Sequence, residues 1–269
     1  MSVARKFIWL SVLVLGISGC GTLPNGREWG QDAIDPLPSW ERIGRSALGA
    51  ALDPLTWAPV VGAAVLQIDD YDQRISEWAI DRTPVFGSIA RAQNASNWLL
   101  GASFAEALVS TVATPGGEDF DDWVEYKLRG LEVEAVGLGI TYGTAELDKR
   151  LLRRKRPDST DFMSFPSGHA AGSFYSATVT SKNLDSIEMP EILRLGLQTG
   201  AYATAAATGW GRVETGKHYV SDVLVGAALG HFVAAFIHDT FLGLPLRDRF
   251  TFDLGLSRRE VGLVFRISF

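Results

Sequence analysis

The residues around His218 have the types and spacing needed for nucleophilic catalysis on an anion. His218 and Asp222 are four residues apart, so on a helix they share one face. An aspartate one turn away can take the Nδ1 proton of the imidazole and leave the Nε2 lone pair as a nucleophile or base. Arg212, expected in the loop before this helix, can donate two hydrogen bonds to one phosphate. The segment predicts a reactive histidine beside a bound phosphate.

A second histidine follows a short segment that is typical of a helix start. Pro166 and Ser167 suit the first turn of a helix, whose unpaired backbone N–H groups attract anions. Gly168 allows the backbone to approach such an anion closely, and His169 comes next in the chain. On its own, the same pattern also fits an ordinary helix cap with a histidine nearby. Beside the first segment, it predicts a second imidazole at the same anion.

A basic segment, residues 149–157, follows a long helical pattern. Continuing the core-facing stripe of that helix leads to Lys149, Leu152 and Arg156. Cations on an inward stripe need an anionic partner, so Lys149 and Arg156 are expected to bind the anion. The other basic residues here are explained by the negative end of the helix dipole. The apolar stripe itself is Leu128, Leu131, Ala135, Leu138, Tyr142 and Ala145.

In order and spacing, the three segments resemble the signature of the type 2 phosphatidic acid phosphatase family. The signature is Lys-x6-Arg-Pro, then Pro-Ser-Gly-His, then Ser-Arg-x5-His-x3-Asp, and the resemblance spans residues 149–222. It implies an all-α helical bundle. One position departs from the pattern, because Gly211 stands where the family has a serine before Arg212. The departure removes one hydroxyl donor to phosphate and touches neither histidine.

The resemblance implies how phosphate is bound. Lys149, Arg156 and Arg212 would bind the phosphoryl oxygens and offset the charge of the transition state. The Ser167 hydroxyl and the Gly168 N–H would add hydrogen bonds. Because three fixed cations supply the positive charge that other phosphatases take from magnesium, neither a metal nor any other cofactor is expected.

The resemblance also implies the catalytic roles. His218 would attack phosphorus and form a phosphohistidine, with Asp222 orienting its ring. His169 would protonate the leaving group and then activate the water that hydrolyses the intermediate.

Several functions remain open. The favoured one is hydrolysis of a phosphomonoester or pyrophosphate of a membrane lipid, and a soluble phosphoester is the close alternative, since similar sites occur in soluble acid phosphatases. A vanadate-dependent haloperoxidase resembles the family in its phosphate-binding residues, but this chain is short for that group. A non-catalytic envelope lipoprotein is disfavoured by the complete set of His169, His218 and Asp222.

The first twenty residues predict a targeting segment. A basic pair precedes an apolar run from Phe7 to Ser18, and Ile17–Cys20 resembles the lipobox of bacterial lipoproteins. We therefore expect a signal peptide over residues 1–19 and a lipid such as palmitate on Cys20. No acidic residue follows Cys20 directly, so resemblance to Gram-negative sorting implies the periplasmic face of the outer membrane. An ordinary secretory signal and an uncleaved anchor helix are the alternatives.

The composition disfavours nucleic acid as a partner. The chain has 269 residues and a formal net charge of -6, and an acidic surface repels a phosphate backbone. The mean hydropathy is +0.09. The longest uncharged runs, such as Val223–Ile237, reach about 15 residues, whereas a membrane-spanning helix needs about 20. We therefore expect a helical domain that lipid holds at the membrane.

The chain divides into four predicted parts. Residues 1–19 are the signal peptide, and residues 20–45, with three prolines, are a tether. Residues 46–245 are the helical phosphatase domain. Residues 246–269 are a β-hairpin, because apolar residues alternate up to the terminal phenylalanine, and it is expected to pack on the domain, on a second copy or on an envelope partner. The predicted helices are 55–67, 72–82, 86–113, 122–155, 168–182, 190–209 and 218–240.

Histidines and acids outside the motifs are assigned other roles. His231 and His238 face away from His218 on an ideal helix and are expected to be structural or surface groups. The acidic segment 69–72 is interpreted as a solvated face or as favourable charges at a helix start, rather than as a metal site.

Overall fold

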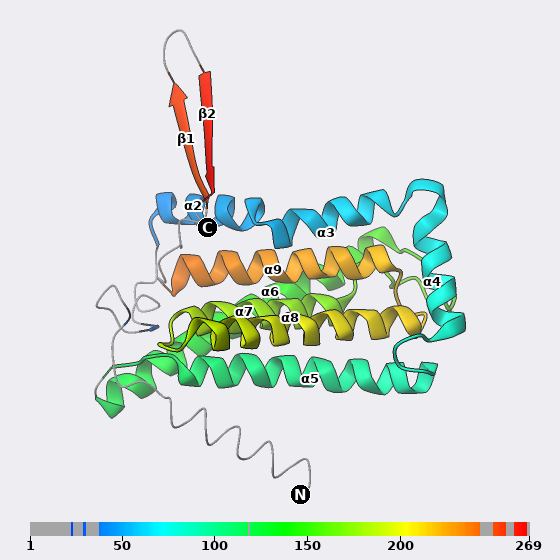
Figure 1. The fold of residues 1–269 in the computed structure, drawn as a ribbon, viewed down its shortest axis with the longest axis horizontal. Helices are drawn as coiled ribbons and strands as arrows, with labels where there is room; N and C mark the ends of the chain where they lie inside the picture. The colour runs from blue at the N-terminus through cyan, green and yellow to red at the C-terminus, as the bar shows by residue number, and fades with distance from the viewer. Residues whose placement is uncertain are drawn as a thin grey trace, which may run out of the picture.

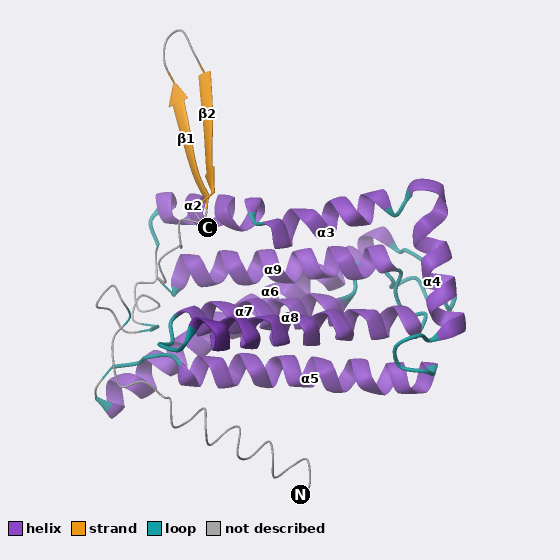
Figure 2. Ribbon diagram, in the orientation of Figure 1, coloured by secondary structure: helices purple, strands orange, loops and turns teal. Residues whose placement is uncertain are grey.

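The computed structural model describes residues 23, 29–30, 38–117, 119–242, 250–256 and 261–267. Within these residues the chain forms an all-α bundle, and strands occur only near the C-terminus (Figure 2). The expected signal peptide, Cys20 and most of the expected tether lie outside the described residues. The lipid anchor and the division into four parts therefore stay predictions.

Eight α-helices make up the described bundle (Figure 1). Seven of them confirm the helices predicted from hydrophobic periodicity, with ends displaced by a few residues. The other, α2, begins inside the expected tether, because the Ser39 Oγ accepts a hydrogen bond from the Arg42 N–H at 3.2 Å and caps the first turn. The helices are α2 (Trp40–Leu52), α3 (Pro54–Val65), α4 (Tyr71–Arg82), α5 (Ile89–Ala113), α6 (Phe120–Leu152), α7 (Gly168–Asp185), α8 (Glu191–Glu214) and α9 (Val220–Phe241).

Helix α7 lies at the centre of the bundle, packed against α5, α6, α8 and α9 (Figure 1). Its approach to α9 is very close: a Cβ on Gly226 would lie 2.5 Å from the Ser167 carbonyl oxygen, and one on Gly230 would lie 2.1 Å from the Ala171 carbonyl oxygen. Both positions therefore require glycine. The two contacts advance together along α7 and α9, so the helices run parallel and begin at the same end of the bundle.

The inward stripe of α6 is offset from the predicted one. Leu128 is 56% exposed, and Ala135 is also exposed. The reason is close packing, because a Cβ on Gly137 would lie 2.3 Å from the Tyr175 hydroxyl oxygen and large side chains do not fit along this contact. The buried residues of α6 are Lys127, Gly130, Glu134, Gly137, Thr141 and Ala145.

Large apolar side chains instead cover much of the outside of the bundle. Trp40 on α2 is 87% exposed and Trp98 on α5 is 81% exposed. Helix α9 is long and apolar enough to cross a membrane, but 61% of its apolar window is buried in the bundle, as expected for a core helix. Helices α2 and α3 pass the same test only as a pair bent by 46°. Their outward residues Trp57, Val61 and Val65 are half exposed, so this pair presents an apolar surface.

A buried carboxyl group lies between α5, α6 and α7. Glu134 accepts hydrogen bonds from the Thr111 hydroxyl at 2.7 Å and from the Asn183 amide at 3.1 Å. Burial raises its pKa to about 7, and these two hydrogen bonds and the charge of Lys127 offset the effect only in part. The folded protein therefore holds the proton of Glu134 at a pH where the unfolded chain has lost it.

Replacing Glu134 by Gln is expected to stabilise the protein at high pH. The raised pKa means that the cost of ionising Glu134 is absent near pH 4 and grows as the pH rises through 7. Glutamine keeps one acceptor and adds a donor for Thr111, so by about pH 8 the variant should gain about 2–3 kcal/mol relative to its value at pH 4. Thermal unfolding from pH 4 to 8 measures the difference, with exposed Glu132→Gln as the control. If the difference in melting temperature between Glu134→Gln and the parent protein did not change with pH, the prediction would be contradicted.

Two strands follow the helices. β1 (Phe250–Leu256) pairs antiparallel with β2 (Val261–Ile267), with Phe250 opposite Ile267 and Leu256 opposite Val261. The residues on both sides of the pair lie outside the described part of the chain. The expected packing of the hairpin on the domain or on a partner stays a prediction.

Candidate active site

The predicted site residues come together at the end of the bundle that α4 covers (Figure 1). Lys149 lies in the last turn of α6, His169 in the first turn of α7, Arg212 in the last turn of α8, and His218 just before α9. Burial, and then the positive charges of Arg212, Lys149 and Arg156, lower the pKa of both imidazoles. Three cations from separate parts of the chain therefore lie near enough to both histidines to act on them electrostatically.

Lys149 lies over the start of α7. A Cβ on Gly168 would be 3.3 Å from the Lys149 Nζ, so the ammonium group is next to the glycine backbone. The side chain is 16% exposed, and Glu146 is 3.9 Å away. Burial lowers the pKa of Lys149, and the charges of Arg156 and Arg212 lower it further. Because burial and nearby positive charges disfavour its protonated form, Lys149 would be stabilised by a bound anion.

Arg156 reaches the site from a loop, so its predicted place on the α6 stripe is wrong. Helix α6 ends at Leu152, because Arg153 takes a left-handed conformation with φ 48°. The Arg156 Nε donates to Asp161 at 2.6 Å and its Nη1 donates to the Lys217 carbonyl oxygen at 3.0 Å. These two contacts orient the guanidinium, and nothing in the helical spacing indicated them.

Arg212 belongs to the last turn of α8 and not to the predicted loop. It is 7% exposed, and its Nη1 donates to the Gln93 Oε1 at 3.0 Å and to the Ser96 Oγ at 3.4 Å. Its Nε is a buried donor with no hydrogen-bond partner among the described residues. Burial first, and then the charge of Arg156, lowers the pKa of Arg212 to about 10. A buried cation of this kind needs an anion to offset its desolvation.

Gly211 is explained by the approach of α5. A Cβ at this position would lie 2.9 Å from the Ser96 Cβ and 3.1 Å from the Ala92 carbonyl oxygen. The serine of the family signature would therefore force α5 and α8 apart. In its place, the Ser96 hydroxyl of α5 lies beside Arg212.

The start of α7 is joined to α9. Ser167 is the N-cap, with its hydroxyl accepting from the Ala170 N–H at 3.4 Å, and its own N–H donates to the Asp222 carbonyl oxygen at 3.0 Å. His169 is in the first turn, and its Nε2 is 3.0 Å from the Asn97 Oδ1. Burial and the neighbouring cations lower the pKa of His169 to about 4. A bound anion would raise that pKa again.

The ring of His218 is held by a backbone carbonyl. The side chain is 3% exposed, and its Nδ1 is 2.5 Å from the Ser164 carbonyl oxygen. Because a carbonyl oxygen only accepts, Nδ1 carries the hydrogen and Nε2 keeps its lone pair. Burial, Arg212 and Arg156 hold the pKa of His218 well below its usual value. A neutral imidazole with a bare Nε2 is the form a nucleophile requires.

Asp222 does not make the predicted hydrogen bond to His218. Its Oδ2 is 3.9 Å from the His218 Nδ1, because the Ser164 carbonyl oxygen occupies that direction. The carboxylate instead accepts from the Ser164 hydroxyl at 2.5 Å and from the Tyr219 N–H at 2.8 Å. Asp222 therefore orients His218 indirectly, by holding the loop residue whose carbonyl binds Nδ1.

Two residues outside the expected set complete this network. The Arg154 Nη1 lies 2.6 Å from Asp222, and its Nη2 lies 2.8 Å from Asp72 of α4. Asp72 is 3% exposed and also accepts from the Ser221 N–H at 2.8 Å. Its interpretation as part of a solvated acidic face is wrong, whereas the alternative, an acidic charge at a helix start, is confirmed, since Asp72 lies in the first turn of α4. The assignment of Arg154 to the helix dipole is wrong. The basic segment gave only a weak signal for Arg154, and nothing in the sequence connected Asp72 with the site.

The remaining histidines are structural. His231 is 3% exposed and lies between Thr178 at 2.8 Å and Asp53 at 3.3 Å. His238 is 1% exposed, and its Nε2 is 3.1 Å from the Asn183 Oδ1. Among the described residues, no group of three or more His, Cys, Asp or Glu side chains has the arrangement of a metal site.

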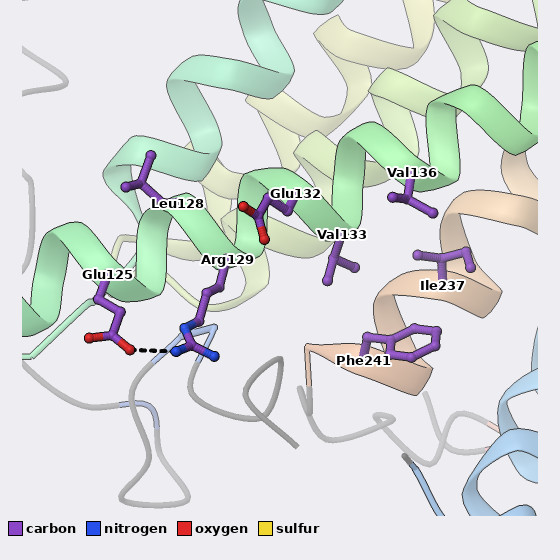
Figure 3. A pocket seen from close by; sticks show the side chains of 8 residues that line it. All are labelled: Glu125, Leu128, Arg129, Glu132, Val133, Val136, Ile237 and Phe241. Carbon is purple, nitrogen blue, oxygen red and sulfur yellow. Dashed lines mark hydrogen bonds and ion pairs between the residues drawn. The ribbon is translucent and has the colours of Figure 1, made fainter. Parts of the chain in front are cut away.

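A separate hollow lies between α6 and α9, and Figure 3 shows its lining. Val133, Val136, Ile237 and Phe241 form its apolar part, while Glu125 and Arg129 pair at 2.7 Å at its edge. Ile237 lies about 26 Å along α9 from Val220, the first residue of the helix, at 1.5 Å per residue, and His218 comes just before that residue. None of the site residues lines it, so the hollow is not the candidate active site.

Comparisons with known proteins match part of this chain to one family. Residues 144–243 match the model of the PAP2 superfamily, and this range holds all of the proposed catalytic and phosphate-binding residues. A lipid A 1-phosphatase of Porphyromonas gingivalis is 32% identical over 132 residues, which are 48% of this chain and 27% of that protein. A decaprenylphosphoryl-5-phosphoribose phosphatase of Mycobacterium tuberculosis is 31% identical over 114 residues, which are 39% of this chain and 58% of that protein.

This chain thus spans less than two thirds of the length of the curated relatives it matches. Among solved structures, a transmembrane PAP2 type phosphatidylglycerolphosphate phosphatase from Bacillus subtilis is similar, with a TM-score of 0.44 and 21% identity. The likeness covers 68% of this chain and 92% of that chain.

Proposed function

We propose that this chain, whose residues 144–243 match the model of the PAP2 superfamily, hydrolyses a phosphomonoester or pyrophosphate of a membrane lipid. The proposed route passes through a phosphohistidine on His218 and uses no metal. One observation carries the proposal: the bare Nε2 of His218 lies within the field of three cations. That field attracts a phosphate and stabilises the charge that develops during its transfer.

The first step transfers the phosphoryl group to the enzyme. Phosphate oxygens are bound by Lys149, Arg156 and Arg212, and the Ser167 hydroxyl and Gly168 N–H lie at the start of α7 beside them. The Nε2 lone pair of His218 forms the N–P bond as the bond from phosphorus to the leaving oxygen breaks. That oxygen takes a proton from protonated His169 and departs as an alcohol or a phosphate.

The second step releases phosphate. Neutral His169 takes a proton from a water molecule, whose oxygen bonds to phosphorus as the N–P bond of His218 breaks. His218 thereby regains its lone pair, and inorganic phosphate leaves. The same imidazole acts as acid and then as base, which suits a group whose pKa rises when the dianionic substrate is bound and falls when phosphate leaves.

The lipid substrate is supported by two separate observations. The curated relatives are named for lipid A and for decaprenylphosphoryl-5-phosphoribose. The exposed apolar surface of α2 and α3, which includes Trp57 and Val61, is suited to lie against a bilayer, with tryptophan at the interface. A lipid on Cys20, and hence anchorage at the periplasmic face of the outer membrane, is part of the same proposal. Acylation is tested by mass spectrometry of the mature N-terminus, with Cys20→Ser as the control.

The substrate class is tested with the full chain in detergent micelles. Phosphate release is compared for a lipid phosphomonoester, a prenyl pyrophosphate and p-nitrophenyl phosphate, with and without EDTA. We expect a kcat/KM at least about tenfold higher for a lipid substrate, since its chain adds binding energy, and no effect of the chelator. Equal or better turnover of p-nitrophenyl phosphate would favour a soluble substrate. Halide oxidation that depends on added vanadate would favour a haloperoxidase.

A further inference from the structure

Helix α5 places polar side chains against the site from outside the region that the family model matches. Gln93, Ser96 and Asn97 share one face of α5, whereas the matched region begins at residue 144. The close contact of α5 with Gly211 of α8 brings this face to the site. The face therefore lies against the two phosphate-site residues Arg212 and His169.

The hydrogen bonds of this face form a continuous row. The Gln93 Oε1 accepts from the Arg212 Nη1 at 3.0 Å, and the Gln93 Nε2 donates to the Asn97 Oδ1 at 3.3 Å. The same Asn97 oxygen lies 3.0 Å from the His169 Nε2. Because arginine only donates, it fixes which end of the Gln93 amide is oxygen, and Gln93 in turn fixes the Asn97 amide. An amide oxygen only accepts, so the Nε2 of His169 carries hydrogen.

We propose, on the basis of the phosphatase function proposed above, that Asn97 is a positioning residue that fixes the tautomer of His169. With Nε2–H held by Asn97, the proton that His169 exchanges must pass through Nδ1. Protonated His169 then donates from Nδ1 to the leaving oxygen and returns to the neutral form. Neutral His169 takes the proton of the attacking water at Nδ1. Gln93 links Asn97 to Arg212, which binds phosphate. The general acid His169 is thereby held in a fixed position relative to the phosphate.

Replacing Asn97 by Ala is expected to lower kcat about tenfold or more on an alkyl phosphate, because general acid–base catalysis contributes about 10²–10⁴-fold. KM should change less than about twofold, since Asn97 is not proposed to bind phosphate. The loss of kcat/KM, which reports the first step alone, should be smaller on p-nitrophenyl phosphate, whose leaving group departs without a proton. The matched control is Asn94→Ala, an exposed asparagine on the same helix. Asn97 is itself exposed, so both variants should fold and melt as the parent protein does.

The conservative variant Asn97→Asp separates positioning from a structural role. A carboxylate still accepts from Nε2–H, so kcat should recover most of the loss seen with Asn97→Ala. Its negative charge stabilises the imidazolium, so the His169 limb of the pH profile of kcat/KM should move to higher pH. A merely structural Asn97 would give neither the recovery nor the displaced limb.

The tautomer is also measured without turnover, from the ¹⁵N shifts of the His169 ring in the full chain, assigned by loss of the signal in His169→Gln. We expect Nε2–H in the parent protein and a mixture of tautomers in Asn97→Ala. An Nδ1–H tautomer in the parent, kinetics of Asn97→Ala equal to those of Asn94→Ala, or equal losses of kcat/KM on both leaving groups would overturn the inference. Absence of phosphate release from every ester by the parent protein would defeat the proposed function and leave the tautomer measurement standing.

Discussion

Replacing His218 by Gln should lower kcat by about 10⁴-fold or more, because it removes the atom that forms the bond to phosphorus. Glutamine can still donate from its amide to the Ser164 carbonyl oxygen, which His218 contacts at 2.5 Å, so the fold should survive. The parent protein should also acquire ³²P from a labelled substrate during turnover. That label should withstand alkali and be lost in acid, as expected of a phosphoramidate, and His218→Gln should acquire none.

The comparison needs evidence that the variant is folded. Circular dichroism and the melting temperature of His218→Gln should match those of the parent, and its affinity for vanadate as a phosphate mimic should fall by no more than about tenfold. Turnover within tenfold of the parent would rule out His218 as the nucleophile. An acid-stable label in the parent would point to a different phosphorylated residue.

Replacing Arg154 by Met should cost about 3–5 kcal/mol of stability, because it leaves two buried carboxylates without their cation. Arg154 bridges Asp72 and Asp222 at 2.8 and 2.6 Å, and these side chains are 4% and 0% exposed. Activity should fall as well, since Asp222 holds the loop whose carbonyl orients His218. Thermal unfolding and kcat of the same preparation measure the two effects.

The effect of Arg154→Met should depend on pH in a definite direction. Burial raises the pKa of Asp222 to about 6, against the opposing charge of Arg154. Without Arg154 that pKa rises further, so the stability deficit should be small where Asp222 is protonated in both proteins, near pH 4, and grow as the pH rises through 6 and above. Lys155→Met, which alters an exposed neighbour, is the control.

A second substitution tests whether the network causes the loss. Combining Arg154→Met with Asp72→Asn removes one of the two unpaired charges, so the double variant should be more stable than Arg154→Met alone. A double variant no more stable than the single one, or a deficit in Arg154→Met of less than about 1 kcal/mol, would mean that Arg154 is not the cation that holds α4 to the site.

The positions of the helices and the choice of the proposed reactive residues follow from the sequence by itself. Helical periodicity predicts seven of the described helices, because each buries a stripe that repeats every 3.6 residues. It fails at α2, where the start depends on a single cap from Ser39 inside a proline-rich segment. His169, His218 and the three cations are singled out because their segments resemble, in order and spacing, the signature of a phosphatase family.

Only the tertiary structure decides how those residues are held. The partner of the His218 Nδ1 is a backbone carbonyl, that of Ser164, and every residue has such a carbonyl, so no residue type reveals it. Asp72 and Asn97 come from helices far along the chain from the residues they contact, and local periodicity carries no information about such contacts. The inward stripe of α6 is polar and small, contrary to expectation, because glycine contacts with α7 decide which face can be buried. Spacing along one chain determines which side chains can share a helix face, whereas the directions and distances between faces arise only when the helices pack.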